Sequence, residues 1–304
     1  MTSSLEERDY RWPARSPVGR IAYVNGRYLP HAHATVHIED RALQFADGIY
    51  EVVGLFGGRL FDEEEHLDRL ERSVRETGMA MPMGRAALRQ VIREVARRNG
   101  VTDGLVYMQV TRGAHRRDHP VPERAGRPTL IVTARSLDPT ALARRRQDGV
   151  AVVTRPDERW ARCDIKSTAL LPNILAKTAA RKAGAHEAWL VDRDGFVTEG
   201  SSTSAWIVDK DGHIVTRDLS HAILPGVTRR VILEAAKEGQ ISVTERKFRP
   251  EEAARAREAF LTAASAGIVP VVAIDGRPVG TGTPGPVTAR IRELYERRAA
   301  ARAG

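Results

Sequence analysis

Lys166 is the residue of this sequence with the most evident capacity for covalent chemistry. It stands in the segment RWARCDIKS (159–167), and an apolar-rich run, TALLPNILAKTAA, follows directly. An amine in apolar surroundings can lose its proton and attack a carbonyl carbon. Taken alone, however, the segment favours an ordinary charged side chain whose stem lies along apolar surface and whose amine reaches water.

A phosphate site is indicated farther along the chain. Gly226, Val227 and Thr228 open an expected helix, which brings together free N–H groups, the positive end of the helix dipole and a hydroxyl. Arg69, in HLDRL, offers a guanidinium that can pair bidentately with the same phosphate. Each signal is weak by itself, because helix amino termini are common and an arginine on an amphipathic helix is usually solvated.

Glu199, in FVTEGSSTSAW, supplies a carboxylate. A lysine able to form a Schiff base, a phosphate site and an acid are the parts that a pyridoxal phosphate enzyme requires. An ionised acid at the pyridine nitrogen keeps that nitrogen protonated, so that the ring remains an electron sink. A glutamate at a strand end in a polar turn is otherwise unremarkable in function.

The elements that must position these residues can be read from turn signals and periodicity. Asn25 and Gly26, in IAYVNGRYL, suit a type I′ turn between two short strands. Two amphipathic helices follow and end at Gly78 and Gly100. Strands are then expected in LVYMQVTRG and PTLIVTARS, so the first part of the chain is an α+β unit with a mainly antiparallel sheet.

A polar stretch around SLDPTALARRRQDG divides the chain into two expected domains. We predict a small amino-terminal domain over 1–138 with an extension over 1–18, a connection over 139–147, and a large cofactor-binding domain over 148–304. The second domain should contain a run of short strands, helices in NILAKTAARKAG and GVTRRVILEAAKEG, and a terminal amphipathic helix.

Composition excludes several classes of protein. The chain has 304 residues, of which 42% are hydrophobic, and its mean hydropathy is −0.36. The apolar runs are too short to span a bilayer and the first residues do not read as a secretory signal, so we expect a cytoplasmic protein with no membrane partner. The single cysteine, Cys163, excludes an internal disulfide and a multi-cysteine zinc site, and no metal is expected.

The charge of +9 and the pI near 10.1 raise the alternative of a basic nucleic-acid-binding module. The basic residues are mostly arginines dispersed among glutamates, which favours solvated helix faces that attract anionic small molecules. We therefore expect no nucleic-acid partner. A nucleic-acid-binding module would instead retain DNA in a salt-sensitive way and carry no visible chromophore.

A set of segments, in family order over nearly the whole chain, identifies a resemblance to a known family. The segments are EDRALQFADGIYEVV (39–53), HLDRL (66–70), YMQVTRGAHRRDHPVPE (107–123), RWARCDIKSTALLPNILAK (159–177), VTEGSSTSAW (197–206), ILPGVTRRVI (223–232) and FLTAASAGIVPV (260–271). The chain resembles the fold-type IV pyridoxal phosphate transaminases, and within them the D-amino acid transaminases. The resemblance implies an α+β, two-domain fold with a small α/β amino-terminal domain and a larger domain that holds a pseudo-barrel of strands.

The resemblance also implies which residues hold pyridoxal 5′-phosphate. Lys166 would form the Schiff base and act as the catalytic base, and Glu199 would pair with the pyridine nitrogen. The remaining cofactor contacts would come from Arg69, Leu224, Val227, Thr228, Ala263 and Ala264. Of these, Leu224 would pack on the ring and the others would lie around the phosphate.

Three further residues are implied for substrate binding. Tyr50 would lie beside Lys166 and the substrate carboxylate. Arg117 and His119, in the loop after TRG, would hold that carboxylate, although the adjacent Arg116 leaves the choice of arginine open. In the family this loop comes from the partner subunit, so the resemblance implies a homodimer with shared active sites.

One departure from the family pattern concerns the second phosphate-binding turn. D-amino acid transaminases typically carry serine and threonine there, whereas this chain has Ala263 and Ala264, followed by Ser265. Two hydroxyl donors are missing near the phosphate, so we expect weaker retention of the aminated cofactor. Cofactor loss measured during turnover checks this expectation, and negligible loss would contradict it.

The implied reaction is a ping-pong transfer of the amino group from a D-amino acid, such as D-alanine or D-glutamate, to a 2-oxo acid, such as pyruvate or 2-oxoglutarate. Three activities of the same fold stay open: a branched-chain L-amino acid transaminase, an (R)-amine transaminase and an aminodeoxychorismate lyase. The Arg117 and His119 pair counts against the first, because that enzyme recognises the carboxylate differently.

Overall fold

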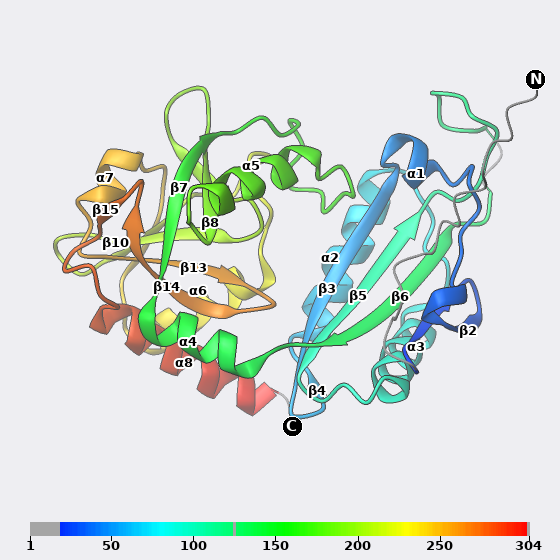
Figure 1. The fold of residues 1–304 in the computed structure, drawn as a ribbon, viewed down its shortest axis with the longest axis horizontal. Coiled ribbons are helices and arrows are strands. Elements are labelled where there is room, and N and C mark those ends of the chain that lie inside the picture. Colours follow the sequence, from blue (N-terminus) through cyan, green and yellow to red (C-terminus); the bar gives the residue numbers. More distant parts are fainter. Residues whose placement is uncertain (1–18, 124–125, 303–304) are drawn as a thin grey trace, which may run out of the picture.

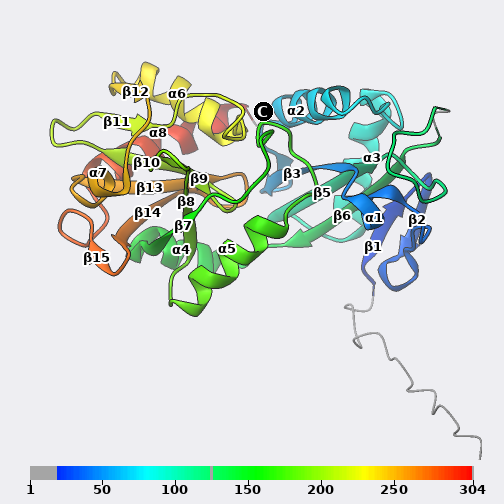
Figure 2. The ribbon, with the colours of Figure 1, turned by 90° about the horizontal axis from the view of Figure 1, so that it is seen from above.

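The computed structural model describes residues 19–123 and 126–302, so the extension predicted over 1–18 lies outside the described residues. These residues form two sheets, and each sheet carries its own helices (Figure 1, Figure 2). The predicted α+β class is confirmed. The division into domains stays a prediction, although the chain does pass from the first sheet to the second after residue 136.

The first sheet is antiparallel throughout and runs in the order β2-β1-β6-β5-β3-β4. Its strands are β1 (Ile21–Val24), β2 (Arg27–Pro30), β3 (Gly48–Phe56), β4 (Arg59–Leu60), β5 (Gly104–Thr111) and β6 (Thr129–Ser136). The predicted hairpin turn is confirmed, because Asn25 and Gly26 have φ angles of 46° and 92°, in the left-handed region that a type I′ turn requires.

Helices α2 (Glu63–Glu76) and α3 (Arg85–Arg98) cover one face of this sheet. The predicted apolar face of α2 is buried, with Leu67, Leu70 and Val74 all in the core beneath the sheet. A short 3-10 turn (His31–His33) and helix α1 (Arg41–Phe45) precede β3. The opposite face of β3, β5 and β6 is left for the functional site.

The second sheet runs in the order β12-β11-β10-β13-β14-β7-β8-β9, with β15 added beside β14. Its strands are β7 (Val150–Pro156), β8 (Glu187–Val191), β9 (Val197–Gly200), β10 (Ser204–Val208), β11 (Ile214–Thr216), β12 (Val243–Glu245), β13 (Glu258–Ala263), β14 (Gly267–Ile274) and β15 (Arg277–Pro278). It is a mixed sheet, since β7 pairs in parallel with β8 and β14 while most other pairs are antiparallel.

The helices of this half are α5 (Leu171–Lys182), α6 (Val227–Glu238), α7 (Pro250–Ala254) and α8 (Pro286–Arg302). Helices α6 and α8 pack together and cover a core that includes the stacked rings of Trp206 and Phe260. Each helix predicted from the sequence of this half is present. No described helix has the length and apolar character needed to cross a membrane.

One further helix, α4 (Pro139–Asp148), fills the segment that the sequence analysis treated as a connection. The Asp138 side chain caps it by accepting hydrogen bonds from the N–H groups of Thr140 and Ala141. Leu142 is its one buried residue, which explains why no apolar period is visible in the sequence.

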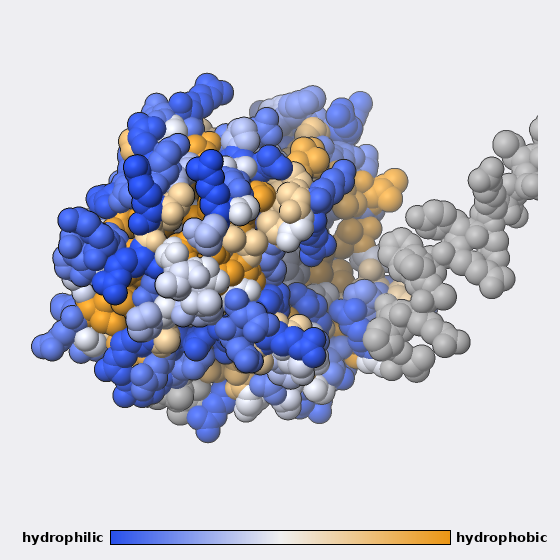
Figure 3. Space-filling view, turned by 60° about the vertical axis from the view of Figure 1, so that its left-hand side comes forward, coloured by the Kyte–Doolittle hydropathy of each residue, from blue (hydrophilic) through white to orange (hydrophobic). Residues whose placement is uncertain are grey.

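The distribution of charged residues on the surface agrees with the expectation that basic residues are dispersed among acids. Hydrophilic side chains cover most of the face seen in Figure 3, and apolar residues show mainly between them. On α2 and α3 many arginines pair with acids, as Arg93 does with Glu63 and Arg98 with Glu94.

Candidate active site

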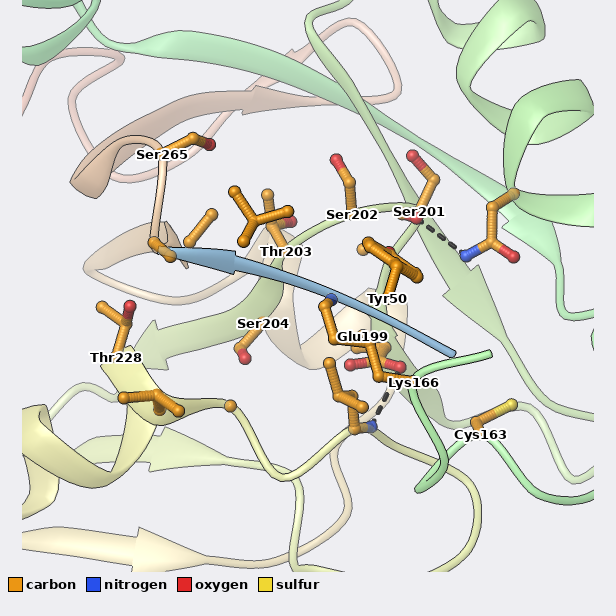
Figure 4. A pocket seen from close by; sticks show the side chains of 18 of the residues that line it. Tyr50, Cys163, Lys166, Glu199, Ser201, Ser202, Thr203, Ser204, Thr228 and Ser265 are labelled. Carbon is orange, nitrogen blue, oxygen red and sulfur yellow. Dashed lines mark hydrogen bonds between the residues drawn. The ribbon is translucent and has the colours of Figure 1, made fainter. Parts of the chain in front are cut away.

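A cavity of about 310 Å³ lies between the two sheets, and we call it the central cavity. Both halves of the chain line it. Among the predicted site residues, those that line the cavity are Tyr50, Arg69, Lys166, Glu199, Leu224, Val227, Thr228, Ala263 and Ala264. Figure 4 shows Thr228 and Ser265 at one end, and Tyr50, Lys166 and Glu199 towards the other.

Backbone contacts to β3 position Lys166. Strand β4 covers only the far end of β3, so the edge near Gly48 is free to pair with another segment. The Tyr50 N–H donates to the Lys166 carbonyl at 3.0 Å, and the Thr168 N–H donates to the Gly48 carbonyl at 2.9 Å. The Lys166 Nζ then stands 4.3 Å from the centroid of the Tyr50 ring, within cation–π range. The amine is thus held inside the cavity beside an aromatic ring.

Glu199 is the last residue but one of β9, and it is almost fully buried, at 7% exposure. The same carboxylate oxygen, Oε1, accepts a hydrogen bond from the Leu224 N–H at 3.2 Å and a second hydrogen bond from Arg159. Burial raises the pKa of Glu199 above its usual value, while Arg159, the Leu224 N–H and Lys166 oppose that rise. A protonated nitrogen brought to this carboxylate would favour the ionised acid further.

Arg159 is a site residue that the sequence analysis did not assign. Asp157 accepts from its Nε at 2.9 Å and from its Nη2 at 2.7 Å, and the Ala222 carbonyl accepts at 3.0 Å. This framework fixes the guanidinium against Glu199. The signal was present in the sequence, because Arg159 opens the segment that contains Lys166.

The other end of the cavity has the form of an anion cup. Helix α6 begins at Val227, and no side chain caps the N–H groups of its first turn. Thr228 adds a hydroxyl at the start of the helix. Arg69 closes the cup and donates to the Pro225 carbonyl at 3.2 Å, just before α6.

Glu51 is a second residue that the sequence analysis missed. Its carboxylate is fully buried and accepts from Arg69 at 2.9 and 2.7 Å and contacts His66 Nδ1 at 3.0 Å. Burial pushes the pKa of Glu51 upward, but Arg69 and His66 outweigh burial and hold it well below its usual range. Glu51 therefore holds the Arg69 guanidinium in its position at the cup.

We expect Glu51→Gln to lower the free energy of unfolding by about 3 kcal/mol, because the buried Arg69 charge loses its partner. The matched control is Glu71→Gln, which removes a half-exposed partner of Arg85 and should cost about 1 kcal/mol or less. Urea denaturation measures both. Since the folded pKa of Glu51 is lowered, its contribution exists above its unfolded pKa and fades as the pH falls below about 4. Equal losses in the two variants would contradict this account.

The turn after β13 forms one wall of the anion cup. It contains the two alanines that stand where D-amino acid transaminases typically carry serine and threonine. Ala263, Ala264 and Ser265 line the cavity there. The Ala264 carbonyl lies 3.0 Å from the position of a Cβ at Gly54, so β3 passes directly over this turn. Neither alanine offers a hydroxyl, and the weaker cofactor retention stays a prediction.

Arg117 and His119 do not line the central cavity of their own chain. The Arg117 guanidinium lies 5.3 Å from the centroid of the Phe45 ring, and the His119 ring is 5.3 Å from the same ring. Arg41 holds the loop by donating to the carbonyls of Asp118 at 2.6 Å and His119 at 3.2 Å. The loop is thus ordered against α1, and its role in a partner's site stays a prediction.

The donor set fits pyridoxal phosphate. An amine, an acid and an anion cup share one cavity, and Leu224 links the last two: its N–H binds Glu199, and α6 begins three residues later. The aldehyde, the pyridine nitrogen and the phosphate of the cofactor would each meet a group of matching chemistry.

Comparison with known proteins agrees with this chemistry. Residues 48–274 match the sequence profile of the family described as amino-transferase class IV. The chain is 38% identical to a D-alanine aminotransferase of Bacillus licheniformis, over 90% of this chain and 94% of that one. It is 37% identical to a D-alanine aminotransferase of Staphylococcus epidermidis, over 90% and 96% of the two chains.

A solved structure with a similar fold is the branched-chain amino acid aminotransferase of a T.th. strain with pyridoxamine 5′-phosphate. Its TM-score is 0.85 at 28% identity, and the match covers 93% of this chain and 95% of that one. The structural likeness therefore extends over nearly all of both molecules.

Proposed function

This chain belongs to the amino-transferase class IV family, and we propose that it is a pyridoxal phosphate-dependent transaminase that moves the amino group of a D-amino acid to a 2-oxo acid. The observation that carries the proposal is the meeting of Lys166, Glu199 and the amino terminus of α6 in one cavity. The relatives named D-alanine aminotransferase support the choice of D-amino acids.

When bound, pyridoxal phosphate supplies a ring that takes up the electron pair left on Cα after deprotonation. Glu199 would pair with the pyridine nitrogen and keep it protonated, with Arg159 holding the carboxylate in place. Arg69, Thr228 and the first N–H groups of α6 would hold the phosphate. Leu224 provides the apolar surface between these two ends.

Lys166 binds the cofactor and acts as the general base, with Nζ removing the proton from the Cα of the substrate. Tyr50 keeps the amine in place through contact with its ring. Both residues line the cavity, so a substrate beside them lies between the two sheets.

We also propose a homodimer in which Arg117 and His119 of one subunit hold the substrate carboxylate in the site of the other. Helix α5 supports this, because its exposed apolar side chains Leu171, Ile174 and Leu175 lie beside the cavity-lining Leu170. A second subunit seated there would cover them and bring its loop to the cavity.

Hybrid dimers are the sharpest measurement of site sharing. We expect an equal mixture of Lys166→Ala and Arg117→Ala subunits, after exchange, to recover about a quarter of the wild-type rate, because half of the dimers are mixed and each has one intact site. Each parent variant alone should stay well below that level. Failure of the mixture to exceed its parents, with exchange shown by mass spectrometry, would mean that each site is built from one chain.

A visible-absorption scan of the purified protein with D-alanine, and a parallel scan with L-leucine, tests the function. We expect the absorption of the bound cofactor to change with D-alanine alone. The solved branched-chain relative makes L-leucine the informative competitor. A response to L-leucine alone would retain the family and assign a branched-chain L-amino acid transaminase, and no absorption would contradict the cofactor itself.

A further inference from the structure

Ser204 is a residue of the central cavity to which no role has been given above. It is the first residue of β10, and its side chain lines the cavity. Figure 4 shows it between Thr228, at the anion cup, and Glu199. Its Oγ lies 3.2 Å from the position of a Cβ at Gly226, the residue directly before α6. Ser204 is therefore a close neighbour of the cup.

The direction of the Ser204 side chain follows from the strand. Because side chains alternate between the two faces of a strand, Ser204 is on the same face of β10 as Trp206. Trp206 belongs to the core that α6 and α8 cover, so the Ser204 hydroxyl meets the first turn of α6. A side chain at position 226 would crowd this hydroxyl, whereas glycine leaves room beside it for a ligand.

The Ser204 hydroxyl is available to a ligand. Within residues 19–123 and 126–302 it makes no hydrogen bond. Thr262, which is paired with Ser204 across β10 and β13, already accepts a hydrogen bond from Trp206 Nε1 at 3.0 Å. Ser204 is half-buried at the wall of the cavity, so its hydroxyl can donate to an anion that enters the cup.

Strand register also links Ser204 to the turn that lacks hydroxyl groups. Ser204 is in register with Thr262, and Ala263 and Ala264 follow Thr262 in the chain. Neighbouring strands are about 4.8 Å apart, so Ser204 lies one strand away from this turn. On its other side it meets Gly226. Ser204 thus places a hydroxyl between the two backbone segments that form the cup.

We propose that Ser204 is a further cofactor-binding residue, whose hydroxyl donates a hydrogen bond to the phosphate group. The inference rests on the proposed pyridoxal phosphate-dependent function and adds a residue to its phosphate site. Ser204 supplies one donor where Ala263 and Ala264 leave two missing. The weaker retention of the aminated cofactor predicted from those alanines therefore stands, and loss of Ser204 makes it weaker still.

The test titrates the full-length protein, stripped of cofactor, with pyridoxamine 5′-phosphate and with pyridoxamine. Pyridoxamine 5′-phosphate has no aldehyde for Lys166, so its affinity depends on noncovalent contacts alone. We expect Ser204→Ala to raise its Kd about 10-fold, because a hydrogen bond to a charged group is lost. Pyridoxamine has no phosphate, and its Kd should stay within about twofold of the wild-type value.

Two further variants make the result specific. Ser136→Ala removes an exposed hydroxyl at the end of β6, outside the cavity, and should change neither Kd. Ala263→Ser, added to Ser204→Ala, returns one hydroxyl to the cup from the other side and should recover part of the affinity for pyridoxamine 5′-phosphate.

An unchanged Kd for pyridoxamine 5′-phosphate in Ser204→Ala would overturn the role of Ser204. So would an equal loss with pyridoxamine, because that loss would come from the ring end of the site. Either result would leave the transaminase function standing, since the wild type would still bind the cofactor. A wild type that binds neither pyridoxamine 5′-phosphate nor pyridoxal phosphate would overturn both.

Discussion

Lys166→Ala should lower kcat/KM for D-alanine by at least about 10,000-fold, because in the proposed mechanism one substitution removes both the covalent attachment of the cofactor and the base that takes the Cα proton. The fold should survive the change. Residues 166–168 are held against β3 by backbone hydrogen bonds, which an alanine in place of Lys166 retains. Steady-state kinetics with D-alanine and pyruvate measure the loss.

Lys182→Ala is the matched control, since Lys182 ends α5 on an exposed surface. It should leave kcat/KM unchanged within about twofold. Circular dichroism of both variants checks that the fold is retained. A Lys166→Ala enzyme that turns over at a tenth of the wild-type rate would remove Lys166 from the chemistry.

Glu199→Gln should reduce kcat by about 100-fold to 1,000-fold, because an amide cannot keep the pyridine nitrogen protonated. The amide has nearly the shape of the acid, and Arg159 keeps Asp157 as its partner. The loss is therefore electrostatic rather than structural. Single-turnover kinetics on the loaded enzyme separate it from weaker cofactor binding.

We expect Glu199→Gln to raise the stability of the apoenzyme, although it lowers kcat. Burial raises the folded pKa of Glu199 above its unfolded value, so the favourable contribution exists at low pH and is lost as the pH rises through the folded pKa. At neutral pH the buried charge is a cost that the neutral amide of Glu199→Gln would not carry, so the apoenzyme of the variant should melt at a higher temperature. A variant that is both slower and less stable would indicate a structural role for Glu199.

Much of the fold was predictable because local signals agreed. The turn at Asn25 and the helix end at Gly78 both require positive φ, and both are found. Strand β3 was not predicted as an element, because Glu51 on its buried face interrupts the apolar alternation. An acid is buried at this position because it pairs with the Arg69 guanidinium on α2. This contact becomes visible only in the folded structure.

In the candidate site, too, some residues were predictable from sequence motifs and others were placed only by the fold. Lys166 and Glu199 were predicted because they sit in motifs whose residue types suit the chemistry, and the structure brings both into one cavity. Arg159 and Glu51 act through contacts to residues distant in sequence, at separations of 40 and 18 positions.

The pairing of Glu51 with Arg69 bears on the order in which the protein is made. Both residues precede the passage of the chain from the first sheet to the second, whereas Lys166, Glu199 and α6 all follow it. Synthesis begins at the amino terminus, and early segments can fold while later ones are still on the ribosome. Because Glu51 already pairs with Arg69, the guanidinium can be oriented before the rest of the phosphate cup has been translated.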